Sequence, residues 1–594
     1  MPDVPATFPR SRLEAPRPTG SGAVDAAVAI WSALAALGTG DVVLAPGSRS
    51  APLVYALGEG QVAGQLDAHV RIDERASAFT ALGISRHDPA RPAAVVTTSG
   101  TATAHLLAAV MEAHHSRIPL LVLTADRPAE LKGVGANQTT RQAGLFSSLV
   151  RFEADLPAPN ADAATPVELR TAVSTAARAF AAATGEHPGP VHLNLGFRDP
   201  LVPAAPGSRP RCPESADGQE PAPIVLTRRA DRGAPHPQPV PVDGATVVVA
   251  GDGAGAAATR FAHRHRLPLL AEPSSGARDG ETLVPGYPAL LAEVMADRDH
   301  ALRPSRAIVF GRPTLSRPVI GALLGADDVD VIVVDPGADW TDAARRAQLV
   351  VPAADGRGAP APARWLEAWR EAAQRVSRAA GEPSWQQRAA LAVWQATTAG
   401  DILVLGSSSL VRDLEQRAGS TPGRVIANRG LAGIDGTTSV AGGIALAHTR
   451  ERARTGRDSR DDPTASGQDS RPPSSGQRTA GRVRALMGDL TALHDLTGLI
   501  IGPDEQTPEL DLVVVDDGGG RIFAGLEHAA APPELLRRFF TTPHGTDLAA
   551  AAAALGASAR TVDVDGLPAA LATPATGLRM IVVQEGPSPL SPSS

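Results

Sequence analysis

Short apolar runs alternate along the first 200 residues with longer segments in which apolar positions recur at helical spacing. The elements that this pattern predicts are helices over 23–37, 73–85 and 102–114 and strands over 41–45, 93–98 and 120–124. The strand segments are apolar throughout rather than alternating with polar residues. Such strands are typical of a parallel sheet whose two faces are both covered by helices.

The same alternation begins again at a strand over 246–250 and a third time near residue 385, so the chain is predicted to hold three doubly wound α/β domains. The predicted divisions are a first domain over 1–202, a Pro-rich linker over 203–241, a central domain over 242–384 and a third domain over 385–594. Residues 449–482 have almost no large apolar side chains, and we expect them to form a disordered surface loop.

Composition narrows the class of protein. A chain of 594 residues is too long for one hydrophobic core. A single cysteine, Cys212, excludes an internal disulfide or a cysteine metal site and suits a reducing cytoplasm. No apolar run is long enough for a membrane span, and no signal-peptide core is evident at the N-terminus. The net charge of −7 gives no sign of the excess positive charge that is typical of nucleic-acid-binding proteins.

Two acidic motifs follow predicted buried strands near the C-terminus. They are Gly488-Asp489-Leu490-Thr491 and Asp516-Asp517-Gly518-Gly519-Gly520. Ligands bind at the carboxyl ends of strands in doubly wound sheets, and paired carboxylates there suit a hard divalent ion that also holds phosphates. The alternative is two ordinary strand-to-helix turns rich in glycine and aspartate.

The spacing of these motifs resembles the thiamine diphosphate fingerprint. That resemblance implies a magnesium ion held by Asp489, Asp517 and the carbonyl of Gly519. Enzymes of this class also use a glutamate at the end of a strand in another α/β domain, and Glu74 in Arg71-Ile72-Asp73-Glu74-Arg75 is the candidate. The alternative for Glu74 is an acidic residue that favours the positive end of a helix dipole.

Longer segments carry a closer resemblance. They are APGSRSAPL (45–53), RIDERASAFTALG (71–83), TTSGTATAHLLAAVMEAHH (97–115), LTADRPAELKGVGANQTTRQAG (123–144), GRPTLSRPV (311–319), NRGLAGIDG (428–436) and GDLTALHD (488–495). In this order they closely resemble the MenD family, the 2-succinyl-5-enolpyruvyl-6-hydroxy-3-cyclohexene-1-carboxylate synthases of menaquinone biosynthesis. The three domains would then be the pyrimidine-binding, central and diphosphate-binding domains of that architecture.

The resemblance implies a reaction and its cofactors. Thiamine diphosphate with Mg²⁺, or Mn²⁺, would support decarboxylation of 2-oxoglutarate. The succinyl carbanion equivalent would then add to isochorismate in a 1,4-addition. Because both substrates are carboxylates, arginines that grip carboxylates bidentately suit the site.

The resemblance also assigns residues to parts of the site. On the succinyl side it places Arg412 and Arg429, and on the isochorismate side Ser48, Arg49, Arg127, Asn137, Gln138 and Arg317. Glu74 would be catalytic, and Ile434 would lie under the cofactor. The remaining cofactor-binding positions that it implies are Ser409, Gly488, Asp489, Leu490, Thr491, Asp517, Gly519, Ile522 and Phe523, with Ile522 and Phe523 as an apolar wall.

The architecture implies a homodimer or a dimer of dimers, because the glutamate domain of one chain meets the metal domain of another. Two other functions stay open. One is a different thiamine diphosphate-dependent 2-oxoacid decarboxylase or carboligase, and the other is a catalytically inactive scaffold of the same fold. Glu74, Asp489 and Asp517 are all present, which favours an active enzyme.

Overall fold

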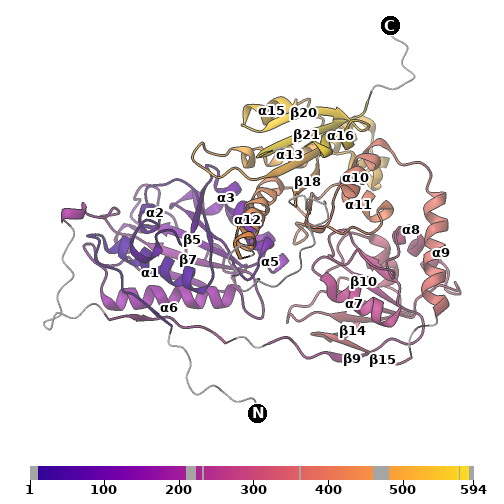
Figure 1. Ribbon diagram of the computed structural model, residues 1–594, viewed down its shortest axis with the longest axis horizontal. Helices are drawn as coiled ribbons and strands as arrows, with labels where there is room; N and C mark the ends of the chain where they lie inside the picture. Colours follow the sequence, from indigo (N-terminus) through magenta and orange to yellow (C-terminus); the bar gives the residue numbers. More distant parts are fainter. Residues whose placement is uncertain are drawn as a thin grey trace, which may run out of the picture. The chain divides into compact units, whose positions relative to one another are not determined.

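The computed structural model describes residues 11–208, 222–230, 233–359, 361, 363–458, 481–573 and 576–586 (Figure 1). They fall into two compact units. Unit 1 contains residues 1–232, 442–448 and 500–507, and unit 2 contains residues 233–441, 449–499 and 508–594. Among the described residues, no helix has both the length and the apolar character that a membrane crossing requires.

Unit 1 is built on a six-stranded parallel sheet. Its strands are β2 (Asp41–Leu44), β3 (Asp67–Val70), β4 (Ala94–Thr97), β5 (Leu120–Asp126), β6 (Glu153–Leu156) and β7 (Pro190–Gly196). They lie in the order β3-β2-β4-β5-β7-β6, and every neighbouring pair is parallel. The chain leaves β2 toward β3 on one side and returns to β4 on the other. A switch of this kind opens a crevice at the carboxyl ends of the strands.

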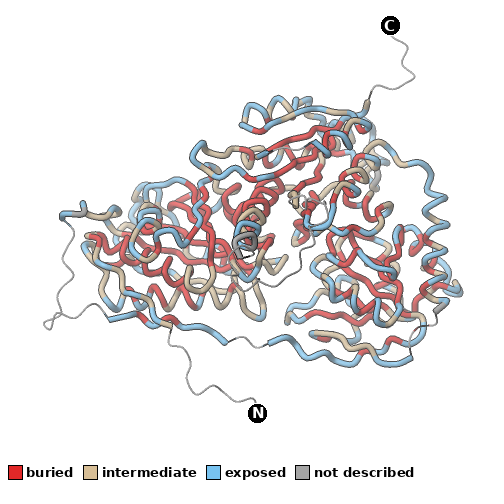
Figure 2. Tube along the Cα trace, viewed as in Figure 1, coloured by how far each residue is buried: buried red, intermediate tan, exposed pale blue. Residues whose placement is uncertain are grey.

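Helices cover both faces of this sheet (Figure 1). Helices α1 (Gly22–Leu37) and α6 (Pro166–Ala183) share a core with alternate strand residues such as Val42 and Leu44. Helix α3 (Glu74–His87) packs on β2 and on α5 (Leu107–Ser116), which follows the short helix α4 (Thr101–Ala104). Strands β2, β4, β5 and β7 are buried (Figure 2), as their largely apolar runs predict, whereas the edge strands β3 and β6 are mostly exposed or half-buried.

Unit 2 contains two further large parallel sheets. The first has the order β11-β10-β12-β13-β14, with strands β10 (Thr246–Ala250), β11 (Leu269–Ala271), β12 (Arg306–Phe310), β13 (Asp330–Val334) and β14 (Ala347–Val351). Helices α7 (Gly255–His265), α8 (Tyr287–Ala296) and α9 (Ala363–Ala379) accompany this sheet. Its two faces are packed by separate apolar clusters, one with α7 and the other with α8 and α9.

The second sheet of unit 2 has the order β17-β16-β18-β19-β21-β20. Its strands are β16 (Ile402–Leu405), β17 (Arg424–Ala427), β18 (Val483–Gly488), β19 (Leu510–Val515), β20 (Ser558–Asp563) and β21 (Leu578–Gln584). Helices α10 (Trp385–Gln395), α11 (Ser409–Arg417) and α16 (Leu567–Ala572) pack against the core residues of one face. The expectation of doubly wound α/β architecture is thus confirmed.

A row of buried charges crosses three neighbouring strands of this second sheet. Arg484 on β18, Asp511 on β19 and Arg579 on β21 are paired in register. The Nε atom of Arg579 donates to Asp511 at 2.8 Å, and Arg484 donates to Asp401 at 3.1 Å. The pKa of Asp401 is lowered, because hydrogen bonds from neighbouring backbone and from Thr398 outweigh the opposing effect of burial.

The linker and the insert differ from the expectation. At the ends of the Pro-rich segment, β8 (Ile224–Val225) pairs with β1 (Arg12–Leu13), and β9 (Gln238–Pro241) pairs with β15 (Ala354–Arg357). Ile224 is buried in the core beside α1, so these ends are fixed to sheets rather than being a free connection. Residues 209–221 and 231–232, in the middle of the predicted linker, lie outside the described residues.

Helix α12 (Thr437–Asp458) corrects the predicted start of the insert at residue 449. The first part of that segment reads Thr449-Arg450-Glu451-Arg452-Ala453, and arginine, glutamate and alanine all favour helix. These residues therefore prolong the preceding helix, although they have little apolar surface to bury. The rest of the predicted disordered insert, over 459–480, lies outside the described residues.

Candidate active site

The predicted site residues of unit 1 follow neighbouring strands of its sheet. Glu74 comes after β3, Ser48 and Arg49 after β2, and Arg127 after β5, with Asn137 and Gln138 further along the same loop. The segment after β4 contains Ser99, which the sequence analysis did not single out. Since carboxyl ends of parallel strands meet at one edge, residues from separate segments gather there.

Glu74 is the first residue of α3, and Asp73 caps that helix by accepting hydrogen bonds from the backbone of Arg75 and Ala76. The Glu74 side chain is half-buried. Among the residues that the structure describes, its carboxylate takes part in no hydrogen bond or ion pair. Capping is done by the neighbouring aspartate, so helix initiation does not require the Glu74 side chain.

Arg127 is held by backbone and hydroxyl oxygens rather than by a carboxylate. Its guanidinium donates to Ser99 Oγ at 2.7 Å and to the carbonyl of Asn137 at 3.1 Å. The amide of Gln138 donates to the carbonyl of Ser99 at 2.9 Å, and Gln138 has a left-handed backbone with φ of 55°. Ser99, in the segment after β4, therefore contacts two separate positions of the loop that carries these predicted residues.

Arg49 lies near Arg127, although the two guanidinium groups repel one another. The pKa of Arg49 is lowered by partial burial and by the charge of Arg127. Arg49 donates to the carbonyl of Phe197 at 3.0 Å, while its nearest carboxylate, on exposed Asp199, is 3.8 Å away. Ser48 is exposed beside it. Unit 1 thus presents an arginine pair whose positive charge is only weakly compensated.

The predicted residues of unit 2 follow neighbouring strands in the same way. Arg429 and Ile434 come after β17, Ser409 and Arg412 after β16, the motif of 488–491 after β18, and Asp517 and Gly519 after β19. These four strands are adjacent in the order β17-β16-β18-β19. Gly488 is the N-cap of the short helix α13 (Asp489–His494), which places Asp489, Leu490 and Thr491 in its first turn.

Asp489 is buried at the centre of an acidic cluster. It accepts hydrogen bonds from the backbone of Leu490 and of Gly519, both at 2.6 Å, and its Oδ2 lies 3.2 Å from His544 Nε2. Ligand atoms of Asp489, Asp516 and His544 all lie within 4.8 Å of one another. Neither Asp516 nor His544 was predicted as a ligand from the sequence. Asp516 is the first residue of the quoted motif, whereas His544 is 55 positions from Asp489 and no spacing pointed to it.

The electrostatics of this cluster suit a divalent cation. The pKa of Asp517 is raised to about 6, first by burial and then by the negative charge of Asp489. The pKa of Asp489 is also raised by burial, against the opposing effect of its hydrogen bonds. A hard ion such as Mg²⁺ binds carboxylate oxygens and offsets the repulsion between neighbouring carboxylates. Coordination by the Gly519 carbonyl stays a prediction.

The loop after β19 brings apolar side chains beside the acidic cluster. Ile522 and Phe523 lie in the short helix η6 (Arg521–Gly525), and both are half-buried. The ring of Phe523 lies 5.6 Å from that of Phe540. Gly519 has φ of 127°, and a Cβ there would meet the carbonyl oxygen of Thr541 at 2.2 Å, so this position requires glycine.

A second arginine group lies in unit 2. Arg429 is buried, and its guanidinium donates to the hydroxyl of Thr314 at 3.0 Å and to the carbonyl of Thr314 at 3.1 Å. Partial burial of the side chain, and then the positive charges of Arg429 and Arg317, lower the pKa of Arg412. Arg412 has no hydrogen bond or ion pair within the part of the chain that the structure describes. Arg317 is exposed and lies 3.9 Å from exposed Glu527.

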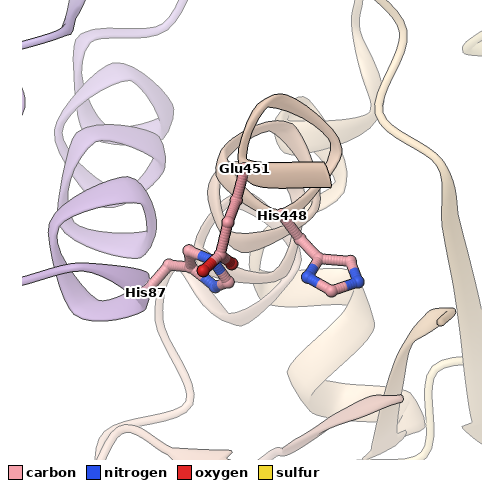
Figure 3. Close-up of side chains that lie close together, drawn as sticks. All are labelled: His87, His448 and Glu451. Carbon is pink, nitrogen blue, oxygen red and sulfur yellow. The ribbon is translucent and has the colours of Figure 1, made fainter. Parts of the chain in front are cut away.

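A histidine pair lies at the opposite end of α3 from Glu74. The rings of His87, the last residue of α3, and His448 on α12 meet edge to face with centroids 5.6 Å apart. Figure 3 shows these rings together with Glu451, which follows His448 by one turn of α12. Helix α3 separates His87 from Glu74 by its whole length, so this pair is no part of the predicted site.

Comparison with known proteins gives the family. Residues 24–145 match the family described as thiamine pyrophosphate enzyme, N-terminal TPP binding domain. The 2-succinyl-5-enolpyruvyl-6-hydroxy-3-cyclohexene-1-carboxylate synthase of Kineococcus radiotolerans is 42% identical over 574 residues, which cover 93% of this chain and 94% of that protein. The synthase of the same name from Leifsonia xyli subsp. xyli is 40% identical over 630 residues, covering 98% and 99%.

A solved structure agrees at the level of the fold. Benzoylformate decarboxylase from Polynucleobacter necessarius has a TM-score of 0.62 at 16% sequence identity, covering 94% of this chain and 98% of its own. Identity at this level supports the architecture alone. With the full-length relatives at about 40% identity, the chain belongs to the 2-succinyl-5-enolpyruvyl-6-hydroxy-3-cyclohexene-1-carboxylate synthase family of thiamine diphosphate-dependent enzymes.

Proposed function

We propose that this enzyme decarboxylates 2-oxoglutarate and joins the succinyl carbanion equivalent to isochorismate by 1,4-addition, a transferase step of menaquinone biosynthesis. Its product would be the 2-succinyl-5-enolpyruvyl-6-hydroxy-3-cyclohexene-1-carboxylate for which its relatives are named. The observation that carries the proposal is the presence of two arginine groups, Arg49 with Arg127 in unit 1 and Arg412 with Arg429 in unit 2. Each arginine group lies at the carboxyl ends of the strands of a parallel sheet. Two substrates that both carry carboxylates need two positively charged groups to bind them.

The arginines bind and orient the substrates in this proposal. Arg412 and Arg429 take the distal carboxylate of 2-oxoglutarate, while Ser48, Arg49, Arg127, Asn137, Gln138 and Arg317 line the isochorismate side. A hydrogen bond to a charged group contributes about 1.5–3 kcal/mol. Because Arg412 has no competing carboxylate bound to it among the described residues, the substrate meets a charge that is still free to pair.

The acidic cluster is the proposed metal site. Asp489, Asp517 and the carbonyl of Gly519 would hold Mg²⁺, or Mn²⁺, and the ion would neutralise the diphosphate of the cofactor. His544 lies 3.2 Å from Asp489 and orients it, and Asp516 lies close enough to contact the same ion. Ser409, Gly488, Leu490 and Thr491 complete the proposed cofactor contacts.

Thiamine diphosphate, when bound, would supply the nucleophilic carbon and the electron sink that decarboxylation of a 2-oxo acid requires. The part proposed for Glu74 is to hold a proton against N1′ of the aminopyrimidine, as a catalytic general acid. Its carboxylate suits that part because no described residue already engages it. Ile434 supports the cofactor, and Ile522 with Phe523 keep water away from the reacting carbon, which favours loss of a charged carboxylate.

The proposed assembly of the enzyme is a homodimer, or a dimer of dimers, in the cytoplasm. Thiamine diphosphate sites need both the glutamate and the metal motif, and in this architecture two chains supply them. A single cysteine in 594 residues suits a reducing compartment.

The test is CO₂ release from 2-oxoglutarate by the purified chain with Mg²⁺ and thiamine diphosphate, with and without isochorismate. We expect slow release alone and a large increase with isochorismate, together with a new product that contains both carbon skeletons. Fast release without an acceptor would instead indicate a simple decarboxylase. No release under any condition, from protein that binds cofactor, would indicate an inactive scaffold.

A further inference from the structure

The arginine pair of unit 2 comes from the β16–β21 sheet, but the groups that hold it come from the other sheet of the same unit. Glu272 follows β11 directly and is buried. Its Oε1 accepts hydrogen bonds from the backbone of both Thr314 and Leu315, each at 2.8 Å. These two residues belong to the loop after β12, so Glu272 fixes that loop from β11, which lies two strands away in the sheet.

The fixed loop contacts Arg429 through Thr314. The hydroxyl and carbonyl of Thr314 accept hydrogen bonds from Nε and a terminal nitrogen of the Arg429 guanidinium. Arg312, from the same loop, donates to the backbone carbonyl of Arg429. A continuous series of hydrogen bonds therefore runs from Glu272 through Thr314 to the guanidinium of Arg429.

Helix α11, which carries Arg412, is anchored from the same sheet. The buried guanidinium of Arg278 donates to carbonyls at the end of that helix, including Leu414 at 3.2 Å and Gly419 at 3.2 Å. A cation at this end also suits the helix dipole. The hydroxyl of Tyr287 donates to the carboxylate of Glu415, one turn after Arg412. The Arg429 side chain and the helix that carries Arg412 are thus held in place by residues that have no predicted site function.

The groups that anchor Arg429 contribute little negative charge of their own. Burial, and then the charge of Glu415, raise the pKa of Glu272 to about 8, so its carboxyl group is mostly neutral near pH 7. Thr314 contributes only neutral oxygens. An arginine held in this way keeps its positive charge for a ligand, whereas an arginine held by a carboxylate would already be paired.

We propose that Glu272 and Thr314 are positioning residues that hold the Arg429 guanidinium for the distal carboxylate of the 2-oxo acid. The proposal rests on the proposed function, because it assigns that carboxylate to Arg429. It predicts that residues beside the β11-β10-β12-β13-β14 sheet, which carries neither the metal motif nor Glu74, set the affinity for 2-oxoglutarate. An error of about 1 Å in placing such a group costs up to about 100-fold.

Two pairs of variants test it. Thr314→Val removes the hydroxyl that Arg429 contacts, and Thr314→Ser keeps it. Glu272→Leu removes the acceptor for the loop, and Glu272→Gln keeps an oxygen there. Thr282→Val, at another buried threonine of unit 2, is the control for a general effect of losing a hydroxyl.

We expect Thr314→Val and Glu272→Leu to raise the KM for 2-oxoglutarate about tenfold, with kcat and the KM for isochorismate within about twofold of wild type. Thr314→Ser and Glu272→Gln should restore the KM to within about twofold. In an Arg429→Ala background, Thr314→Val should add no further increase, because coupled residues are not additive.

The idea is overturned if Thr314→Val leaves the KM for 2-oxoglutarate unchanged, if it lowers kcat alone, or if its effect persists in full without Arg429. Should Glu272→Leu fail to fold, the Thr314 pair decides the question by itself. Wild-type protein that released no CO₂ from 2-oxoglutarate would refute the proposed function instead, so the two failures are distinguishable.

Discussion

At the scale of single residues, the structure separates side chains that serve the fold from those that do not. Asp73, not Glu74, caps α3, and Glu74 has no bonded partner among the described residues. Arg429 is buried but held by neutral oxygens. Side chains that the local fold does not need are therefore the candidates for a role in binding or catalysis.

Replacement of Glu74 by glutamine should reduce turnover by about 10²- to 10⁴-fold, because the amide cannot exchange a proton with the cofactor ring. Cofactor affinity, measured by calorimetry, should change little, since the metal motif is intact. Glu281→Gln, at an exposed glutamate, is the control and should behave as wild type. Turnover close to wild type in Glu74→Gln would remove this residue from the mechanism.

Binding of Mg²⁺ should weaken as the pH falls through about 6, because the pKa of Asp517 is raised from 3.8 to about 6 by burial and by Asp489. A proton that occupies the carboxylate competes with the cation, by up to about tenfold per pH unit. The sign for stability follows from the same shift. Without a cation, the stabilising effect of the proton is complete below pH 3.8 and is lost as the pH rises through about 6.

Titration calorimetry with Mg²⁺ at pH 5.5 and 7.5 measures this dependence. Asp517→Asn should flatten the pH profile at a modest loss of affinity, since asparagine keeps an oxygen donor without the titrating proton. Asp299→Asn, at an exposed aspartate, should keep the wild-type profile. An unchanged slope in Asp517→Asn would show that another group controls the metal site.

At the scale of elements, the order and register of neighbouring strands determine which side chains come together. The register that pairs Arg484, Asp511 and Arg579 across β18, β19 and β21 also brings the ends of β18 and β19 level, so the motifs of Asp489 and Asp517 lie together. A slip of one residue would move each side chain to the other face of the sheet. The buried charges therefore support the register on which the proposed metal site depends.

Replacement of Asp511 by alanine should lower the free energy of unfolding by about 3–5 kcal/mol, because it leaves buried arginine charge without its partner. Denaturant unfolding measures the change. Asp330→Ala breaks a half-exposed ion pair to Arg306 at a strand start and should cost less than about 1 kcal/mol. Equal effects of the two substitutions would mean that the buried row contributes no special stability.

At the scale of the whole molecule, the proposed assembly makes a prediction about mixed subunits. If one chain supplies Glu74 and another supplies Asp489, a dimer of one Glu74→Gln chain and one Asp489→Ala chain contains one intact site. Random co-assembly of the two inactive variants should then recover about a quarter of wild-type activity, since half of the dimers are mixed and half of their sites are intact.

Co-expression of the two variants with different affinity tags tests this, with tandem purification to isolate mixed dimers. Each variant expressed alone is the control and should stay inactive. Mixed dimers that remain inactive, although both tags are present, would place the glutamate and the metal motif of a working site on the same chain.

The sequence alone determined the α/β class, because apolar runs without alternation require sheets covered on both faces. It also determined the candidate residues, since long motifs carry the family resemblance. Local composition misjudged the start of the insert, where helix-forming residues extend α12 to Asp458. It also gave no sign that the ends of the Pro-rich segment pair with β1 and β15.

The tertiary structure decided which distant residues meet. His544 joins Asp489 from 55 positions away, Ser99 contacts both Arg127 and Gln138, and Glu272 supports Arg429 through Thr314. None of these pairings has a fixed sequence spacing, because each depends on which strands lie side by side and on where their carboxyl ends stop. Strand order is a property of the packed sheet, so only the fold could show these contacts.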